Sequence, residues 1–203
     1  MHDDNARMPN RRTMTLAVLS TLALPASTRA AAVVVEGRRF EDTTHLYGRD
    51  LLLNGTGVRA VAWFKGYAAG LYLASRTKVT SEAVAMPGPK RIRLQMLQDA
   101  PAAEFTKAFG KGVSRNTPAA ELPALLDRMH QFERQIDALG QVRKGDVVDL
   151  DLDPERGLVF GLNGTLRGPP IAGADLYASL LRSFIGDRPY DAKLKAGLLG
   201  RPA

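Results

Sequence analysis

Two segments of the chain alternate between apolar and polar residues, which is the pattern of half-buried β-strands. Residues 90–97 place apolar side chains on one face and two arginines on the other. In residues 147–153 apolar residues alternate with aspartates. We expect the aspartates to face water along a sheet edge, where charges discourage edge-to-edge pairing between sheets. The segment 158–167 has Asn163-Gly164 between two apolar runs and predicts a β-hairpin.

Other segments carry apolar residues at helical spacing. Residues 105–113 predict one helix. Thr117-Pro118 then offer an N-cap and a first-turn proline for a long amphipathic helix that Gly140 ends. Residues 176–184 predict a further helix, and Asp191 is suited to cap a last short one.

The most apolar stretch of the chain, residues 58–73, predicts two strands or one long bent strand, because it combines glycines with aromatic and β-branched side chains. Leu51-Leu52-Leu53 is a candidate buried strand that we expect to end at an Asn54-Gly55 turn. Strands joined by hairpins, without regular βαβ alternation, indicate an α+β domain: a mainly antiparallel sheet with helices on one face.

The first 32 residues have the three-part pattern of an export signal. Arginines precede the apolar run 14–24, and small residues suited to a signal peptidase follow it. The run is too short for a bilayer, which needs about 20 apolar residues. We therefore expect residues 1–32 to be a signal peptide and residues 33–203 to be one exported, periplasmic domain. The alternative is a cytoplasmic protein with an amphipathic leader.

The composition excludes several classes of function. The chain of 203 residues has no cysteine, which removes zinc-finger, iron–sulfur and thiol chemistry. Its formal charge of +7 comes from scattered basic residues rather than from a concentrated face, so we expect no nucleic-acid partner. No apolar stretch after the signal is long enough to cross a bilayer, so we expect no stable membrane insertion once the signal is removed.

Metal and cofactor chemistry have no supporting motif in the sequence. His45 and His130 lie far apart without ligand-spaced neighbours, and we expect each on the surface or in a structural role. The acidic run 149–155 lacks the glycine that a calcium loop needs, because Pro154 stands there. No phosphate-binding glycine loop or nucleophile elbow occurs. We therefore expect no metal and no cofactor.

Arg59 is the most distinctive candidate for a ligand site, because it opens the apolar stretch 58–73. A buried guanidinium needs an anionic or strongly polar partner. That partner is either a carboxylate of the protein or solvent, or it is an amphipathic anion whose tail fills an apolar cleft and whose head binds Arg59. Tyr67 and Tyr72 follow in the same stretch, and we take all three as candidate ligand-binding residues.

Several segments, in order and with their spacing, resemble the chalcone isomerase-like family and in particular its exported bacterial branch. They are residues 53–59 (LNGTGVR), 64–73 (FKGYAAGLYL), 87–94 (PGPKRIRL), 144–146 (KGD), 186–189 (GDRP) and the end of the chain at 194–200. The resemblance covers essentially the whole chain after the signal. It implies an open-faced β-sandwich, in which a large antiparallel sheet carries a layer of helices and a ligand cleft lies between them.

The resemblance also bears on catalysis. In the plant enzymes of the family an arginine steers a chalcone phenolate, and a threonine and a tyrosine act through water on the developing enolate. Arg59 matches the arginine, and the threonine position falls on Tyr67. The later tyrosine and asparagine positions fall near Pro101 and Ala108, whose side chains neither donate nor accept hydrogen bonds. Most of the enzymatic set is absent, and an isomerase would retain only Arg59 as its electrostatic anchor.

The fatty-acid-binding relatives from plastids fit the sequence better. In them an arginine and a tyrosine bind the ligand carboxylate, and these roles fall on Arg59 and Tyr67. Eight residues of straight strand would separate the two by roughly 26 Å, so the chain must reverse near Ala62-Trp63-Phe64 to bring them together. We therefore expect a protein that binds a small amphipathic or apolar anion, of fatty-acid or polyphenol type, without catalysis. The alternatives are a chalcone–flavanone isomerase and a protein–protein interaction module with a collapsed cleft.

Overall fold

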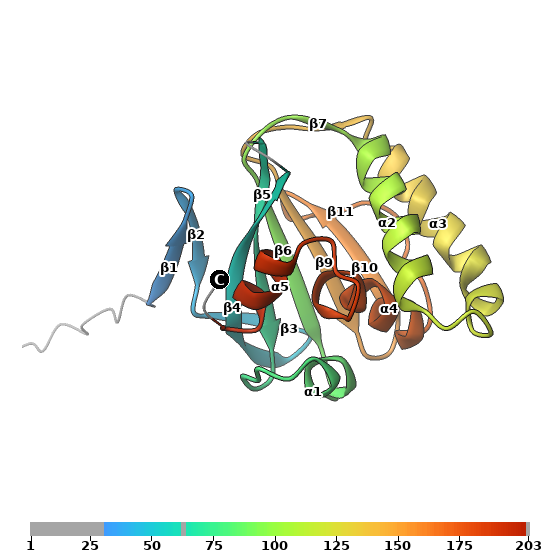
Figure 1. The fold of residues 1–203 in the computed structure, drawn as a ribbon, viewed down its shortest axis with the longest axis horizontal. Helices are drawn as coiled ribbons and strands as arrows, with labels where there is room; N and C mark the ends of the chain where they lie inside the picture. The colour runs from blue at the N-terminus through green and yellow to red at the C-terminus, as the bar shows by residue number, and fades with distance from the viewer. Residues whose placement is uncertain (1–30, 62–63, 202–203) are drawn as a thin grey trace, which may run out of the picture.

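The computed structural model describes residues 31–61 and 64–201, and its main feature is an antiparallel sheet with helices on one face (Figure 1). The sheet has seven strands in the order β11-β10-β9-β6-β5-β4-β3. They are β3 (Thr43–Leu46), β4 (Arg49–Val61), β5 (Phe64–Leu73), β6 (Lys90–Met96), β9 (Val147–Asp153), β10 (Gly157–Leu162) and β11 (Thr165–Leu166). The predicted α+β architecture, an open-faced sheet with a helix layer, is confirmed.

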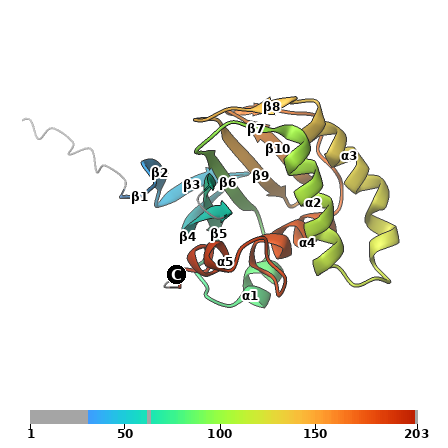
Figure 2. The same cartoon turned by 45° about the horizontal axis from the view of Figure 1, so that its top comes forward.

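The helix layer covers the face of the sheet that carries the larger apolar cluster (Figure 2). Its members are α1 (Thr80–Ala85), α2 (Ala102–Asn116), α3 (Leu126–Asp137), α4 (Ala174–Ile185) and α5 (Ala192–Leu198). A short pairing of β7 (Ala100–Pro101) with β8 (Gln141–Val142) joins the entry of α2 to the exit of α3. Alternating apolar residues of the inner strands therefore face the apolar sides of the helices across one core.

The long helix predicted from residue 117 is shorter than its apolar spacing suggests. Thr117 is the C-cap of α2, and a loop and one 3-10 turn, η1 (Leu122–Leu125), come before α3 begins at Leu126. Pro123 lies inside η1, and a proline there removes a backbone N–H that a continuous helix would use. The last short helix begins as predicted, because Asp191 accepts from the backbone N–H groups that start α5.

Strand β4 continues through Asn54, where a turn was expected. The pairing with β5 shifts by one residue between Leu53 and Gly55, so Asn54 is the extra residue of a β-bulge. Its side chain is buried: Nδ2 donates to the Leu198 carbonyl at 2.7 Å, and Oδ1 accepts from the Thr77 N–H at 2.7 Å. The bulge thus ties the strand to the end of α5 instead of ending it.

A separate hairpin covers part of the opposite face of the sheet (Figure 1). It consists of β1 (Ala32–Val35) and β2 (Arg38–Glu41). Phe40 of this hairpin is buried in a second apolar cluster that includes Tyr72. A Cβ on Gly70 would lie only 2.7 Å from the Phe40 ring, so the glycine is what lets the ring reach β5.

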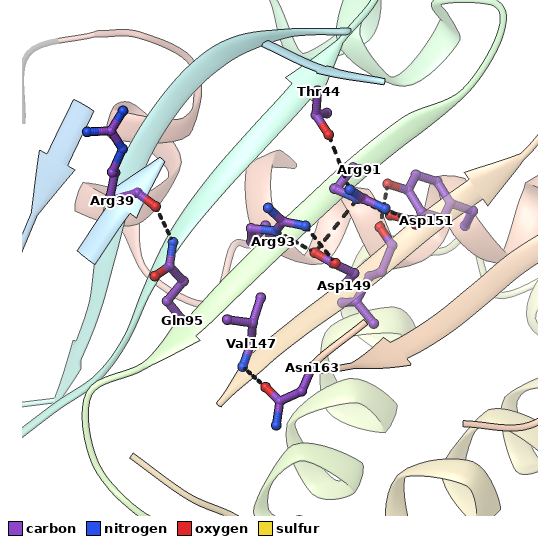
Figure 3. A network of polar contacts seen from close by, with 11 residues as sticks. Arg39, Thr44, Arg91, Arg93, Gln95, Val147, Asp149, Asp151 and Asn163 are labelled. Atoms are coloured by element: carbon purple, nitrogen blue, oxygen red, sulfur yellow. Dashed lines mark hydrogen bonds and ion pairs between the residues drawn. The ribbon is translucent and has the colours of Figure 1, made fainter. Parts of the chain in front are cut away.

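The aspartates of β9 are buried, which corrects the expectation that they face water along a sheet edge. β9 is an inner strand between β6 and β10. Asp151 accepts two hydrogen bonds from Arg91 at 2.6 and 2.7 Å, and Asp149 accepts two from Arg93 at 2.7 and 2.8 Å (Figure 3). Each pair lies directly opposite in the β6–β9 register, so the neighbouring strand neutralises each carboxylate.

The structure does not describe residues 1–30 of the predicted signal peptide, and β1 begins at Ala32. Within residues 31–61 and 64–201, no helix has both the length and the apolar character needed to cross a membrane.

Candidate ligand-binding site

An apolar cavity of about 260 Å³ lies between the sheet and the helix layer. Strands β4, β5, β6, β9 and β10 form its floor, and α2, α3 and α4 cover it. The sheet contributes Arg59, Gly66, Tyr67, Leu94, Met96, Val148, Leu150 and Phe160, and the helices contribute Glu104, Phe105, Ala108, Phe109, Phe132, Ile136, Leu180 and Phe184. A cavity of this size and lining is suited to a small ligand with a large apolar part.

Aromatic rings pack edge to face along one side of the cavity. The centroid of the Phe132 ring lies 4.8 Å from the Phe109 ring centroid and 5.4 Å from the Phe160 ring centroid. The interplanar angles are 83° and 85°. All three side chains are buried. Edge-to-face pairs are a favourable arrangement of aromatic rings, so these three rings form a closely packed wall of the cavity.

Arg59 and Tyr67 lie directly opposite each other, as a ligand site shared by them requires. The register of β4 and β5 pairs Arg59 with Tyr67, and Gly66 is an extra residue of β5 beside them. The predicted reversal between the strands is therefore present, although residues 62 and 63 lie outside the described residues. Both side chains line the cavity.

Asp191 is the protein's own partner for Arg59. One guanidinium nitrogen, Nη1, lies 3.3 Å from Oδ2 of Asp191 and 3.2 Å from the carbonyl of Ala60. The other carboxylate oxygen, Oδ1, accepts from the N–H groups of Lys193 and Leu194 at the start of α5. Burial alone would raise the pKa of Asp191, but these hydrogen bonds and the Arg59 charge lower it, so the carboxylate stays ionised. Asp191 thus fixes one edge of the guanidinium to α5.

Two tyrosines, Tyr67 and Tyr190, line the cavity near Arg59. Burial raises the pKa of Tyr67, and the nearby Tyr190 and Asp191 raise it further while Arg59 lowers it. Burial likewise raises the pKa of Tyr190 to about 12, although a hydrogen bond with Ser183 and the Arg59 charge both lower it. Both phenols therefore keep their protons at neutral pH. The Tyr190 hydroxyl is already hydrogen-bonded to Ser183, whereas the Tyr67 hydroxyl can donate to a ligand. Within residues 31–61 and 64–201 no hydrogen-bond partner is found for the Tyr67 hydroxyl.

Glu104, in the first turn of α2, also lines the cavity. Its side chain is exposed, so water screens its charge from the guanidinium. This end of the cavity is left with Arg59, which is paired with Asp191 on one side, and with the neutral hydroxyl donor of Tyr67. This arrangement can bind an acceptor group such as a carboxylate.

Tyr72 lies apart from the cavity. Its side chain is 1% exposed and packs with Phe40 and Leu51 on the opposite face of the sheet. Successive residues of a strand point to opposite faces, so the odd spacing between Tyr67 and Tyr72 separates them. The structure brings together only two of the three residues taken from the sequence, Arg59 and Tyr67.

The position of α5 depends on close backbone contact with β4. A Cβ on Gly55 would lie 2.1 Å from the carbonyl oxygen of Gly197, so α5 can rest on the strand only because Gly55 has no side chain. This contact sets where α5 begins. It thereby sets where Asp191 meets Arg59.

Tyr190 and Glu104 were not recognised in the sequence as site residues, and Asp191 was recognised only as a helix cap. Tyr190 lies in the loop between α4 and α5, which carries no motif that predicts contact with β4. The motif GDRP at 186–189 comes directly before it. This motif is one of the segments that resemble the chalcone isomerase-like family. It was the one available signal that the loop lies next to the site.

The positions matched to the enzymatic tyrosine and asparagine carry no acid–base group. Pro101 is the N-cap of α2, and Ala108 lines the cavity. In the described part of the chain, no three His, Asp, Glu or Cys side chains are grouped as metal ligands. His45 is exposed and lies 2.8 Å from Asp50, and His130 is exposed on α3.

Comparison with known proteins agrees with this architecture. A chalcone isomerase-like family model matches residues 32–200. Among solved structures, a fatty-acid binding protein of Arabidopsis thaliana is similar with a TM-score of 0.65 and 17% sequence identity. That match covers 83% of this chain and 96% of the other. Among curated proteins no match is found. The low identity to the plant protein shows a shared fold alone, but the family model spans most of the sequence. The chain belongs to the chalcone isomerase-like family.

Proposed function

We propose that this protein binds a small amphipathic anion of fatty-acid type in the cavity between sheet and helices, without catalysis. The observation that carries the proposal is the polarity of the cavity: an apolar space with one guanidinium, Arg59, and the hydroxyl of Tyr67 at one end. A carboxylate accepts hydrogen bonds from such donors. The hydrocarbon tail is then removed from water by aromatic and aliphatic side chains.

The ion pair with Asp191 is compatible with this role. A guanidinium has five N–H donors in a planar fork, and Asp191 contacts it only through Nη1. The remaining edge can bind a ligand carboxylate. Because Asp191 holds the side chain in place, Arg59 loses less conformational freedom when the ligand binds.

The comparison with solved structures supports a binding function. The similar plant protein is named for binding fatty acids, and it has the same fold. In this chain Pro101 and Ala108 stand where the resemblance places hydrogen-bonding groups of the isomerases, so the proposal excludes catalysis. A rate of chalcone cyclisation above the spontaneous rate would contradict that part of it.

Ligand binding is tested with the purified native protein. Mass spectrometry of the molecules released on denaturation should detect a carboxylic acid, and added decanoate should raise the melting temperature. Arg59→Met should weaken decanoate binding at least about tenfold, because a charge-assisted hydrogen bond contributes about 1.5–3 kcal/mol. Arg115→Met, which removes an exposed arginine of α2 outside the cavity lining, is the matched control and should bind normally. Equal binding by both variants would refute the proposal.

We further propose that the protein is exported to the periplasm and represents an exported bacterial branch of the family. The basic, apolar and small-residue parts of residues 1–32 support this. Intact-mass measurement on fractionated cells tests it: a chain shortened near residue 32 should appear in the periplasmic fraction. A full-length chain confined to the cytoplasm would contradict it.

A further inference from the structure

We infer that the cavity selects medium-chain carboxylic acids of about ten carbon atoms over long-chain fatty acids and two-ring chalcones. This inference rests on the proposed function and deepens it. An apolar protein cavity of about 150 Å³ binds one benzene, which is roughly 25 Å³ for each carbon. At the same packing, the cavity of about 260 Å³ holds roughly ten carbons.

The strand order sets the direction in which the ligand lies. Arg59 is on β4 and Phe160 is on β10, and β5, β6 and β9 lie between these strands. Neighbouring strands are about 4.8 Å apart, so the two backbones are separated by about 19 Å. Arg59 and Phe160 are therefore on opposite sides of the cavity. An acid with its carboxylate on Arg59 must point its tail toward Phe160.

The far end of the cavity is closed by packed side chains. Phe160 is 4% exposed and Phe132 is 2% exposed, and their rings meet edge to face. Leu150 and Leu180, which are also buried, complete this end. A longer tail cannot displace these groups without strain in a close-packed interior, so additional methylenes must remain outside the apolar lining.

A series of straight-chain acids tests the inference directly. Calorimetry on the full mature protein would measure the dissociation constants of hexanoate, octanoate, decanoate, laurate and palmitate at concentrations below micelle formation. Each added methylene that is buried should tighten binding about fourfold. We expect this gain up to about decanoate, followed by a plateau or a loss, and no displacement of decanoate by a chalcone.

A cavity-enlarging variant tests the position of the closed end. The chain length at which affinity stops rising is called the break in the series. Phe160→Ala should move this break toward longer acids, because it creates space where the tail ends. Phe40→Ala, a truncation of the same size in the cluster on the opposite face, is the matched control and should leave the break unchanged. If Phe160→Ala does not fold, Phe160→Leu makes a smaller cavity at the same place and should shift the break in the same direction.

The outcomes separate the inference from the function on which it rests. Binding that continues to tighten about fourfold per methylene as far as palmitate would overturn the size limit while leaving acid binding intact. A break that moves equally in Phe160→Ala and Phe40→Ala would overturn the proposed orientation. Failure of every acid to bind would overturn both the size limit and the proposed function.

Discussion

Replacing Tyr67 with phenylalanine separates ligand binding from stability more cleanly than any other change at the site. The substitution removes a single hydroxyl and keeps the ring, which contributes to the apolar core. That hydroxyl has no hydrogen-bond partner among the described residues, while Arg59 and Tyr190 are close enough to perturb its pKa. It is therefore free to donate to a ligand carboxylate.

The expected magnitude follows from this placement. A hydrogen bond to a charged group contributes about 1.5–3 kcal/mol, which corresponds to a loss of affinity of about tenfold to a hundredfold. No bond within the described protein is lost, so the free energy of unfolding without ligand should change by less than about 0.5 kcal/mol. A buried hydroxyl that served structure alone would give the opposite result, with lower stability and unchanged affinity.

Calorimetric titration with decanoate and urea denaturation of the ligand-free protein provide the two measurements. Tyr72→Phe is the matched control, because it removes the same group from the same strand on the face away from the cavity. Its affinity should equal that of the unmodified protein. If Tyr67→Phe binds decanoate as tightly as Tyr72→Phe does, the reasoning that puts a carboxylate at this hydroxyl is refuted.

Three further predictions follow from the packing and electrostatics. Gly55→Ala should lower the free energy of unfolding by about 3 kcal/mol or more, measured in urea, because its methyl would meet the Gly197 carbonyl at 2.1 Å; an unchanged midpoint would contradict the close packing of α5. Arg91→Met should cost about 3–5 kcal/mol by leaving Asp151 as an unpaired buried charge, and adding Asp151→Leu should recover much of that loss. Decanoate affinity should stay constant between about pH 7 and pH 10, because burial raises the pKa of Tyr67, so this donor keeps its proton; a decline centred near the ordinary tyrosine pKa of about 10 would show that it is not shielded.

Much of the secondary structure could be predicted from local patterns. Alternation in β6 and β9 gave the correct apolar face of each strand, and the Asn163-Gly164 pair marked the β10–β11 hairpin. The failures also have local causes. Asn54 and Gly55 have the composition of a turn. Instead, Asn54 forms a β-bulge and Gly55 packs closely against the Gly197 backbone, and both features depend on α5, which comes far later in the sequence.

The candidate site was predictable only in part. The resemblance pointed to Arg59 and Tyr67, and pairing across β4 and β5 brings these two together. The exclusion of Tyr72 could have been read from the sequence, because residues five apart on a regular strand face opposite sides of a sheet. Tyr190 could not, because no spacing rule connects a loop near the C-terminus with the fourth strand.

The sequence by itself determined which residues of this protein share a strand face, where Asp191 caps a helix and that an arginine opens the most apolar stretch. These properties depend on neighbours a few residues away. Only the tertiary structure decided that Asp149 and Asp151 of β9 pair with arginines of β6 and that Asp191 pairs with Arg59 across 132 residues of sequence. It also decided that an open space remains beside Arg59. Such contacts depend on the order of strands and on the packing of helices across them, which short-range patterns along the chain do not specify.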